Sequence, residues 1–550
     1  MRIGEQIKAD FQKVCRKLKI PPTKVVLEHP KDPKNGDFST NWALQQAKKR
    51  VGKIQQTPLE TAKNIVENFP RTSYLAKTEV APPGFINFFL KNSVFQGEVG
   101  EIVKKGEDYA RLDVGHDQKV SVEFISANPT GPLHIGNARG GPLGDVIANV
   151  LDFSGFKVSR DYYHNDVGSQ VEKFGQSIAN VAAGKDLVDQ EYKGEYILEL
   201  AQKIPQAKDP KIAAQKGVEM MLGEILADCQ KMGIDYDHVY QESELLKASK
   251  TKKVIEILKE SGVTRSYQGA LWFAPKDEFL EDRQSVLIRS NGEPTYFAND
   301  IVLHQEKLKK GNRLLIDILG STHHGHVPRM QAAIQALGFD PTKLKIVLYQ
   351  FVRVKRSKEI VKMSKRAGNF VTAHEVLTEV GKDAFRFFML MHDTNTHLDF
   401  DLELAKKKSQ ENPVYYVQYA NARIASILRK VSSTYPSLLR SGVSRQVKYQ
   451  VSSSRQIDYS LLKTDCELAL IRKLIRLPEL VEEISKTLAV HQLTTYAIDL
   501  ADSFHRFYEN CQVLGKDQKL SEARLQLVLA TGIILKTTLK LLGITAPQQM

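Results

Sequence analysis

The chain contains 550 residues, and its 42% hydrophobic and 26% charged residues are ordinary for a globular protein, which excludes wholesale disorder. The length exceeds one ordinary domain and predicts about three to four. The 78 Lys and Arg residues outnumber the 64 Asp and Glu residues by 14, and this excess favours a polyanionic partner such as RNA or DNA.

Residues 1–110 predict a separate α+β domain. Residues 1–18 have the apolar spacing of an amphipathic helix, and the stretch 36–41 predicts a loop that opens a second helix. Strand-like runs lie within 78–90, around the breaker Pro82-Pro83-Gly84. The polar segment 104–118 predicts a linker to the next domain.

Residues 111–410 predict an α/β domain built on a doubly wound, Rossmann-like parallel sheet. Strands are expected at 119–126, 156–163, 286–290, 313–319 and 344–351, with helices between them, one of them running from about 134 to 153. Strands that alternate with helices are typical of a parallel sheet. The segment from about 168 to 276 is too long for a crossover and looks helical, so it predicts a helical domain inserted between the two halves of the sheet.

Residues 411–550 predict an all-α helical bundle. Helical periodicity without strand signals runs from Asn412 onward, and Gly543 and Pro547 end the last helix. The part between Arg423 and Arg455 has seven Arg and Lys residues and no Asp or Glu.

Three tyrosines, Tyr415, Tyr416 and Tyr419, precede this basic run. Basic charge attracts phosphate, and exposed aromatic rings stack on unpaired bases. The alternative is that at least two of these tyrosines pack in the core of a helix.

The stretch Ser126-Ala-Asn-Pro-Thr-Gly-Pro-Leu-His-Ile-Gly-Asn137 joins the first predicted strand to a helix start. Ligands of open parallel sheets bind outside the carboxyl ends of the strands, and a helix N-terminus offers free N–H groups to phosphate. His134 can donate to an oxyanion, and Gly136 leaves a flat backbone surface for a base or ribose. Alone, an HxG sequence more often marks a strand–turn–helix joint with a capping histidine.

A second motif, Lys362-Met-Ser-Lys-Arg366, belongs to a basic loop at about 353–370. A mobile loop with two lysines three residues apart can hold a triphosphate and stabilise departing pyrophosphate. Alone, it could equally be a solvated basic loop. The chain has neither a Walker motif nor GxGxxG, which disfavours P-loop enzymes and Rossmann dehydrogenases.

Together and in this order, the two motifs resemble the HIGH and KMSKS signatures of class I aminoacyl-tRNA synthetases, written here as HIGN and KMSKR. The resemblance implies carboxylate attack on the α-phosphate of ATP, followed by aminoacyl transfer to the terminal ribose of tRNA. It also implies that His134, Lys362 and Lys365 stabilise the phosphoryl transition state, a task that needs positioning and charge more than covalent catalysis.

Acidic and polar residues near the first motif indicate the charge of the substrate. Glu123 lies on the first strand of the sheet, and Tyr296 and Asp300 have the i, i+4 spacing of one helix face. Two carboxylates and a phenol suit a guanidinium, whose planar fork pairs well with carboxylates. Alternatively, Glu123 is a surface ion-pair partner and Asp300 only begins a helix.

The whole chain resembles the arginyl-tRNA synthetases. The matching stretches are GDFSTNWAL, PPGFINFFL, EFISANPTGPLHIGNARGGPLGD, YYHNDVGSQ, TYFANDI, LGSTHHGHVPRM, KMSKRAGNFVT, NPVYYVQYANARI and LLGITAPQQM. They run from residue 36 to residue 550. The resemblance implies an arginine–tRNA ligase that uses ATP with Mg²⁺, L-arginine and tRNA(Arg) and acts as a monomer.

The resemblance also implies a role for individual residues. Arginine-binding residues would be Glu123, Tyr296 and Asp300 at the guanidinium, Ser126 and Asn128 at the amino-acid backbone, Asp166 and Gln170 along the pocket, and one of Thr322, His323 and His324, of which we retain His323. ATP-binding residues would be Pro132, His134, Gly136, Asn137, Gly140, Asp145, Met363, Ser364 and Lys365. Asn137 replaces the second histidine of HIGH, and asparagine donates a hydrogen bond without carrying charge.

For tRNA, the resemblance implies an N-terminal domain at the tRNA elbow and a C-terminal domain at the anticodon. Phe85 and Asn87 match positions that contact a D-loop base, although Phe85 could instead pack against its own sheet. The expected anticodon-side contacts are Tyr415, Tyr419, Asn421, Arg423, Arg429 and Lys430. Asn421 stands where the family's YVQYAxAR stretch would have histidine.

Cysteines and histidines give no metal or disulfide signal. The four cysteines are far apart in the sequence, without a CxxC motif, and a reducing cytoplasm is expected. His323, His324 and His326 lack a carboxylate or cysteine partner close in sequence, so no metal site is expected there. The chain start lacks the apolar core of a signal peptide, and the apolar stretch 525–535 is too short to cross a bilayer, so no membrane is expected.

Two alternatives remain open. The chain could be a class I synthetase for glutamate or cysteine, but the acidic set opposes glutamate, and the absence of clustered cysteines opposes a zinc-dependent cysteine enzyme. It could also be a catalytically idle tRNA-binding protein on the same scaffold, which the intact His134, Lys362 and Lys365 argue against.

Overall fold

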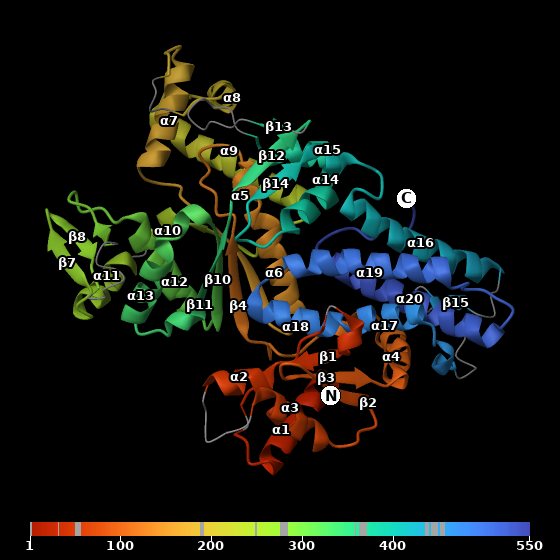
Figure 1. Ribbon diagram of the computed structural model, residues 1–550. Helices are drawn as coiled ribbons and strands as arrows, with labels where there is room; N and C mark the ends of the chain where they lie inside the picture. The colour runs from red at the N-terminus through yellow and green to blue at the C-terminus, as the bar shows by residue number, and fades with distance from the viewer. Residues whose placement is uncertain are drawn as a thin grey trace. The chain divides into compact units, whose positions relative to one another are not determined.

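The computed structural model describes residues 3–21, 23–30, 32–49, 57–187, 192–247, 250–275, 284–357, 359–361, 371–434, 439–441, 449–451 and 457–550. The chain folds into two compact units (Figure 1). The first consists of Met1–Gly106, Val431–Ile475 and His505–Thr531, and the second of Glu107–Lys430, Arg476–Phe504 and Gly532–Met550.

The N-terminal part of the first unit has the expected α+β fold. Its antiparallel sheet has the order β1-β3-β2, with β1 at Phe38–Thr40, β2 at Leu75–Ala81 and β3 at Phe85–Leu90. The helices are α1 (Ile3–Lys17), α2 (Trp42–Lys49), α3 (Pro58–Glu67) and α4 (Asn92–Lys105). Thr57 and Glu60 form a capping box that starts α3. Strand β1 occupies a stretch that the sequence predicts as a loop.

The second unit is built on a five-stranded sheet in which every neighbouring pair is parallel. Its order is β11-β10-β4-β5-β6, with β4 at Lys119–Phe124, β5 at Lys157–His164, β6 at His238–Gln241, β10 at Leu314–Gly320 and β11 at Leu344–Tyr349. The central strand β4 is buried on both faces, as a strand of such a sheet must be. The doubly wound α/β prediction is therefore confirmed.

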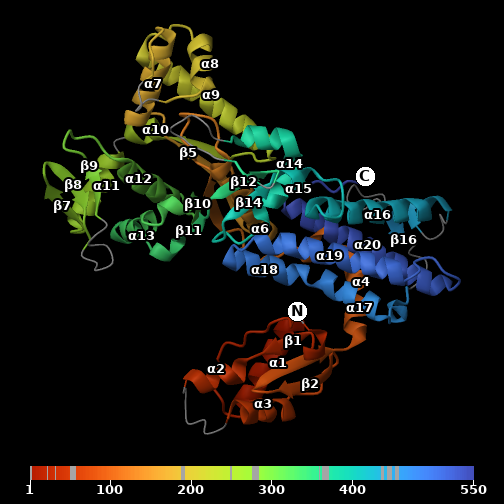
Figure 2. The same ribbon diagram turned by 45° about the horizontal axis from the view of Figure 1, so that its top comes forward.

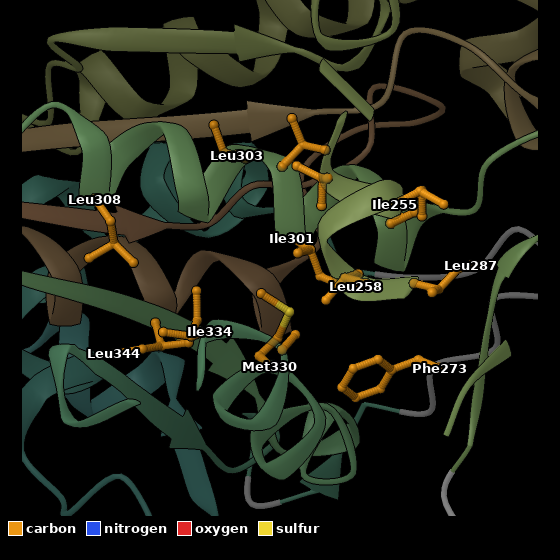
Figure 3. Packing of buried hydrophobic residues seen from close by; sticks show 14 of the residues in the cluster. Ile255, Leu258, Phe273, Leu287, Ile301, Leu303, Leu308, Met330, Ile334 and Leu344 are labelled. Atoms are coloured by element: carbon orange, nitrogen blue, oxygen red, sulfur yellow. The ribbon is translucent and has the colours of Figure 1, made fainter. Parts of the chain in front are cut away.

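Helices cover both faces of this sheet. α6 (Gly140–Phe153) packs on β4, β5 and β10, while α12 (Tyr296–Lys309) and α13 (His326–Ala336) lie on the opposite side (Figure 1). On the α12 side, Ile301, Leu303 and Leu308 of this helix join a buried apolar cluster with Met330, Ile334 and Leu344 (Figure 3). This packing holds α12 against β10 and β11.

Two predictions for the segment before α12 were wrong. The strand expected at 286–290 is β9 (Ser285–Ile288), and it pairs with β7 (Thr264–Tyr267) and β8 (Ala270–Phe273) in a separate antiparallel sheet. The segment 168–276 is not helical throughout, because β6 returns from it to the edge of the parallel sheet. A local apolar run predicts a strand but not the sheet it joins.

The early part of that segment is helical. It contains α7 (Ser169–Ala182), α8 (Glu195–Lys203) and α9 (Pro210–Lys231), which lie side by side in both views (Figures 1 and 2) and share an apolar core. The short helices α10 (Glu242–Lys247) and α11 (Lys250–Glu260) follow β6.

A small three-stranded sheet flanks the second motif. β12 (Val352–Arg356) pairs with β13 (Glu359–Ile360) and β14 (Leu398–Asp401). In the chain, α14 (Ala373–Leu390) lies between β13 and β14, and α15 (Leu402–Lys406) follows β14. Residues 362–370, which carry KMSKR, lie outside the described residues.

The C-terminal region is helical, as predicted. It contains α16 (Pro413–Thr434), α17 (Asp465–Ile475), α18 (Leu477–Thr487), α19 (His491–Asn510) and α20 (Gln518–Leu541), and Gly543 has the positive φ of 68° common after a helix. The absence of strands was a wrong prediction, because β15 (Leu439–Ser441) pairs antiparallel with β16 (Tyr449–Val451).

Candidate functional site

The carboxyl end of β4 opens into a turn with unusual backbone geometry. Ile125 and Ser126 both have positive φ values, 66° and 41°, and each such residue costs about 1–3 kcal/mol. The turn aims the Ser126 hydroxyl at Glu123 Oε1, 3.1 Å away, and lets it accept from the Tyr163 N–H of β5 at 3.1 Å. Strained backbone of this kind clusters at ligand sites.

Glu123 forms a buried ion pair, so the alternative that it is a surface ion-pair partner is wrong. Its Oε2 lies 2.7 Å from Nζ of Lys307, and both side chains are less than a tenth exposed. Burial raises the pKa of Glu123, and the charge of Lys307 opposes that rise.

Asp300, on the first turns of α12, faces two histidines. Its Oδ1 lies 3.1 Å from Nδ1 of His304, and its Oδ2 lies 2.7 Å from Nε2 of His326. Burial favours a higher pKa for Asp300, but the charges and hydrogen bonds of the histidines outweigh it and hold the pKa well below its ordinary value. His304 also contacts Asp317 of β10 at 2.8 Å, and these two carboxylates raise its pKa well above the ordinary value, against the effect of burial. Asp300 is therefore kept ionised by the two histidines, and its side chain is 22% exposed.

The other expected arginine-binding residues gather around the ends of β4 and β5. The Asn128 amide donates to Gln170 Oε1 at 2.9 Å, which joins the turn after β4 to α7. Asp166 accepts from the backbone N–H and the hydroxyl of Ser243 at the start of α10. Tyr296 is the first residue of α12, on the same helical face as Asp300.

Sequence reasoning missed a buried carboxylate in this cluster. Glu242, the first residue of α10, is 3% exposed and accepts from the Asn299 amide at 2.5 Å. Within the described ranges, its Oε2 and the buried Tyr163 hydroxyl have no hydrogen-bond partner. Burial first, and then the nearby charges of Asp166 and Asp300, raise the pKa of Glu242 to about 7. Buried polar atoms without a protein partner are rare, and they make this cluster a candidate ligand site.

Of His323, His324 and His326, it is His326 that hydrogen-bonds to Asp300, whereas the sequence-based expectation is His323. His323 is exposed nearby, and desolvation and the charge of His326 lower its pKa. In the sequence, His326 stands out only as one of three histidines of a possible metal site. Lys307 could have been found from its spacing of eleven residues from Tyr296 on α12, but Glu242 carries no local signal.

The HIGN motif is tied to the segment that follows KMSKR. His134 caps α5 (Ile135–Ala138), and its Nδ1 accepts from the Gly136 N–H at 2.9 Å. The Ile135 N–H donates to Val371 at 3.1 Å, and Ala373 donates to the Leu133 carbonyl at 2.8 Å. These bonds place the described end of the KMSKR loop beside His134.

The other expected ATP-binding residues divide into two groups. Pro132, Gly136 and Asn137 are at least partly exposed around His134, whereas Gly140 is buried where a Cβ would lie 3.2 Å from the Tyr349 ring. Asp145 is also interior, because its carboxylate pairs with Arg386 at 2.6 Å and Arg160 at 3.1 Å. We therefore leave Asp145 out of the ATP site. Lys362, Met363, Ser364 and Lys365 lie outside the described residues.

Three of the expected tRNA contacts form a stripe on α16. The rings of Tyr415 and Tyr419 are stacked with centroids 6.4 Å apart, and Arg423 donates to the Tyr419 hydroxyl at 3.1 Å. All three side chains are partly exposed, although the tyrosines had a core-packing alternative. Arg429 is also partly exposed and Lys430 is exposed.

Two other expected tRNA contacts are engaged within the protein. Asn87 is 5% exposed and accepts from the Ser39 hydroxyl at 2.7 Å. Asn421 is 8% exposed and donates to the Pro547 carbonyl at 2.7 Å. Phe85, at the start of β3, is partly exposed.

In the part of the chain that the structure describes, no group of three or more His, Cys, Asp or Glu residues could hold a metal ion. The four cysteines are free thiols. None of the described helices is long and apolar enough to cross a membrane.

Three family models match the chain. They are the arginyl tRNA synthetase N terminal domain at residues 2–90, the tRNA synthetases class I (R) catalytic domain at 98–204 and 202–409, and the DALR anticodon binding domain at 417–550.

Individual proteins match over nearly the full length. The arginine–tRNA ligase of Carboxydothermus hydrogenoformans is 40% identical over 540 residues, which cover 95% of this chain and 94% of the relative. That of Desulforudis audaxviator is 41% identical over 551 residues, which cover 96% and 94%. The fold is similar to that of Thermus thermophilus arginyl-tRNA synthetase, with a TM-score of 0.80, 23% identity and full coverage of both chains. The buried carboxylates, the HIGN turn and these full-length similarities agree, and the chain belongs to the arginyl-tRNA synthetase family of class I aminoacyl-tRNA synthetases.

Proposed function

We propose that this protein activates L-arginine with ATP and transfers it to the 3′ terminal adenosine of tRNA(Arg), releasing AMP and pyrophosphate. The observation that carries the proposal is the cluster of carboxylates at the carboxyl ends of β4 and β5 and along α12. Glu123, Asp300 and Glu242 supply three carboxylates there, directly beside the turn that leads to His134. Such a cluster suits a substrate that carries a cationic side chain.

The guanidinium would bind between Asp300, Glu242 and Tyr296. A guanidinium offers five N–H donors and no acceptor, so it needs carboxylate and phenol oxygens around it. Asp300 is held ionised by its histidines, and Glu242 has an oxygen without a protein partner in the described ranges. Glu123, Ser126 and Asn128, on the turn after β4, would hold the amino-acid backbone and the near part of the side chain.

Adenylate formation would take place beside His134. Because Gly136 lacks a Cβ, which would lie 3.0 Å from His134 Nδ1, the imidazole can cap α5 through this nitrogen. His134 would stabilise charge on the phosphate during adenylate formation. Pro132 and Asn137 would line the nucleotide, and Lys362, Met363, Ser364 and Lys365 would bind the triphosphate and stabilise its charge. Magnesium would enter with the phosphates of ATP as part of the substrate.

The tRNA would contact both ends of the chain. The stacked Tyr415 and Tyr419 with Arg423 suit unpaired anticodon bases and their phosphates, because aromatic rings stack on bases and arginine pairs with phosphate. Arg429 and Lys430 continue the same helix and would add phosphate contacts, and Phe85 would contact the elbow. We propose a cytoplasmic monomer.

The decisive experiment is ATP-dependent charging of total tRNA, with each of the twenty amino acids tested in turn. We expect charging with arginine alone and its loss in His134→Ala. Charging with glutamate or cysteine would indicate another class I specificity. Binding of tRNA without any charging would indicate the idle tRNA-binding protein.

A further inference from the structure

A fully buried lysine lies directly behind the arginine pocket. The ammonium of Lys307 is 2.7 Å from Glu123 Oε2 and 3.2 Å from Asp161 Oδ2, and its side chain is 2% exposed. It also lies 5.2 Å from the centroid of the Tyr240 ring. Lysine is almost never fully buried unless it is paired, so these two carboxylates define its position.

The helix that carries Lys307 is rigidly held. Its polar face carries Tyr296, Asp300, His304 and Lys307, which follow one another at spacings of four, four and three residues. Its apolar residues Ile301, Leu303 and Leu308 are buried in the cluster shown in Figure 3. Because that packing fixes the helix in place, the position of Lys307 relative to β4 and β5 is fixed as well.

The two carboxylates depend on Lys307 to different degrees. Asp161 also accepts from the hydroxyls of Ser121 and Ser159, each at 2.5 Å, and these bonds with Lys307 lower its pKa although burial opposes them. Glu123 has only the Ser126 hydroxyl beside Lys307 among its described hydrogen-bond donors, and burial raises its pKa. Loss of Lys307 would therefore affect the ionisation of Glu123 more than that of Asp161.

We propose that Lys307 is a positioning residue for arginine binding, which keeps the Glu123 carboxylate ionised and oriented toward the substrate. The inference rests on the proposed role of Glu123. A protonated Glu123 would present an O–H donor to a substrate whose guanidinium and ammonium are themselves only donors. An ionised Glu123 accepts from them, and Lys307 occupies its second oxygen.

The charged groups that face Glu123 come from three elements. They are Lys307, His304 and Asp300 of α12, Asp317 of β10 and Asp161 of β5. The negative charges of Asp317 and Asp300 raise the pKa of Glu123 and so favour its protonation. His304 opposes protonation of Glu123 less than Lys307 does, and its own ion pairs are with Asp300 and Asp317. Lys307 is therefore the cation that pairs directly with Glu123.

The test is a double-mutant cycle with Lys307→Met and Glu123→Gln in the full-length enzyme, measured by charging of tRNA at pH 7.5. We expect Lys307→Met to raise the arginine KM about tenfold or more, with the ATP KM and kcat changed far less. Each unit by which the pKa of Glu123 exceeds the assay pH lowers its ionised fraction about tenfold. The double variant should have the arginine KM of Glu123→Gln alone, because Lys307 acts through Glu123. Multiplying effects would overturn the proposal.

A pH series separates positioning from a general loss of structure. In Lys307→Met, the arginine KM should fall more steeply than in the wild type as pH rises from 6.5 to 8.5, because Glu123 regains its charge. The double variant should show only the wild-type fall. Asp161→Asn is the matched control, since it removes the other partner of Lys307 and leaves Glu123 paired. It should change the arginine KM by less than about threefold. An equal effect of Asp161→Asn and Lys307→Met would overturn the proposal.

The outcomes also separate this inference from the proposed function. An unchanged arginine KM in Glu123→Gln would refute the role of Glu123 itself. A raised KM in Glu123→Gln with an unchanged KM in Lys307→Met would refute only the role of Lys307. If Lys307→Met does not fold, the double variant, which removes both charges of the pair, is compared with Glu123→Gln. Equal arginine KM values support the proposal, and a higher value in the double variant overturns it.

Discussion

The pH dependence of arginine binding follows from the environment of Glu242. Burial and the nearby Asp166 and Asp300 raise the pKa of this carboxyl group to about 7. The guanidinium of arginine stays charged throughout the neutral range and pairs with the ionised carboxylate. With the guanidinium bound as proposed, arginine binding is expected to release the proton that Glu242 holds below pH 7.

The expected size of the effect follows from this pKa. With a pKa of about 7, Glu242 is roughly one-tenth ionised at pH 6 and nine-tenths ionised at pH 8. The arginine KM should therefore be about tenfold higher at pH 6 than at pH 8. In Glu242→Gln, the KM should stay high and lose this dependence, because an amide has no proton to release in this range.

The assay is tRNA-dependent charging across pH 6–8.5 with ATP and tRNA saturating. The groups around Glu242 are Asp166 after β5, Tyr163 of β5, Asp300 and Tyr296 of α12, and Arg289 after β9. Glu244→Gln is the matched control, because Glu244 is an exposed glutamate on the same helix. Parallel KM profiles for the wild type and Glu242→Gln would refute the reasoning.

Three further predictions test other parts of the chain. Glu242→Gln should raise the melting temperature of the arginine-free protein at pH 8 but not at pH 4.5. The pKa of Glu242 in the folded protein, about 7, lies above its ordinary value of 4.5, so its ionisation lowers the free energy of unfolding as pH rises. Well above pH 7 this loss is complete and amounts to roughly 3 kcal/mol at most. Equal melting shifts at both pH values would contradict this. Lys365→Ala should lower the charging rate by about 10²–10³ and leave tRNA affinity nearly unchanged; near-normal charging in rapid-quench measurements would exclude its role. Replacing Arg429, Lys430 and Arg440 together with alanine should flatten the salt dependence of tRNA binding in filter assays, and an unchanged slope would show that this basic run is only solvated.

Much of the fold could be predicted because its signals are local. The alternation of apolar strands with helices around residues 119–163 and 313–351 predicts a parallel sheet, and both parts join it. The strand at 285–288 could not be assigned to its sheet in this way. Its apolar run resembles the others, and only pairing with β8 removes it from the parallel sheet.

The site residues divide in the same manner. Glu123, Ser126, Asn128 and His134 lie within twelve residues, so a strand followed by a turn and a helix start already predicts that they lie together. Asp145 belongs to the same stretch, but its pairing with Arg386 depends on a residue 241 positions away. Local spacing places a side chain along a helix and does not show what the other elements bring to it.

The sequence by itself determined the fold class, the order of the domains, the two signature motifs and the family, because each of these depends on residues that are neighbours in the chain. The tertiary structure alone decided which charges are buried together. Lys307 meets Glu123 across 184 positions, Asn299 meets Glu242 across 57, and His326 meets Asp300 across 26. The ionisation of these groups depends on the removal of water and on the distance to the opposite charge, and both quantities arise only when the sheet and α12 pack together.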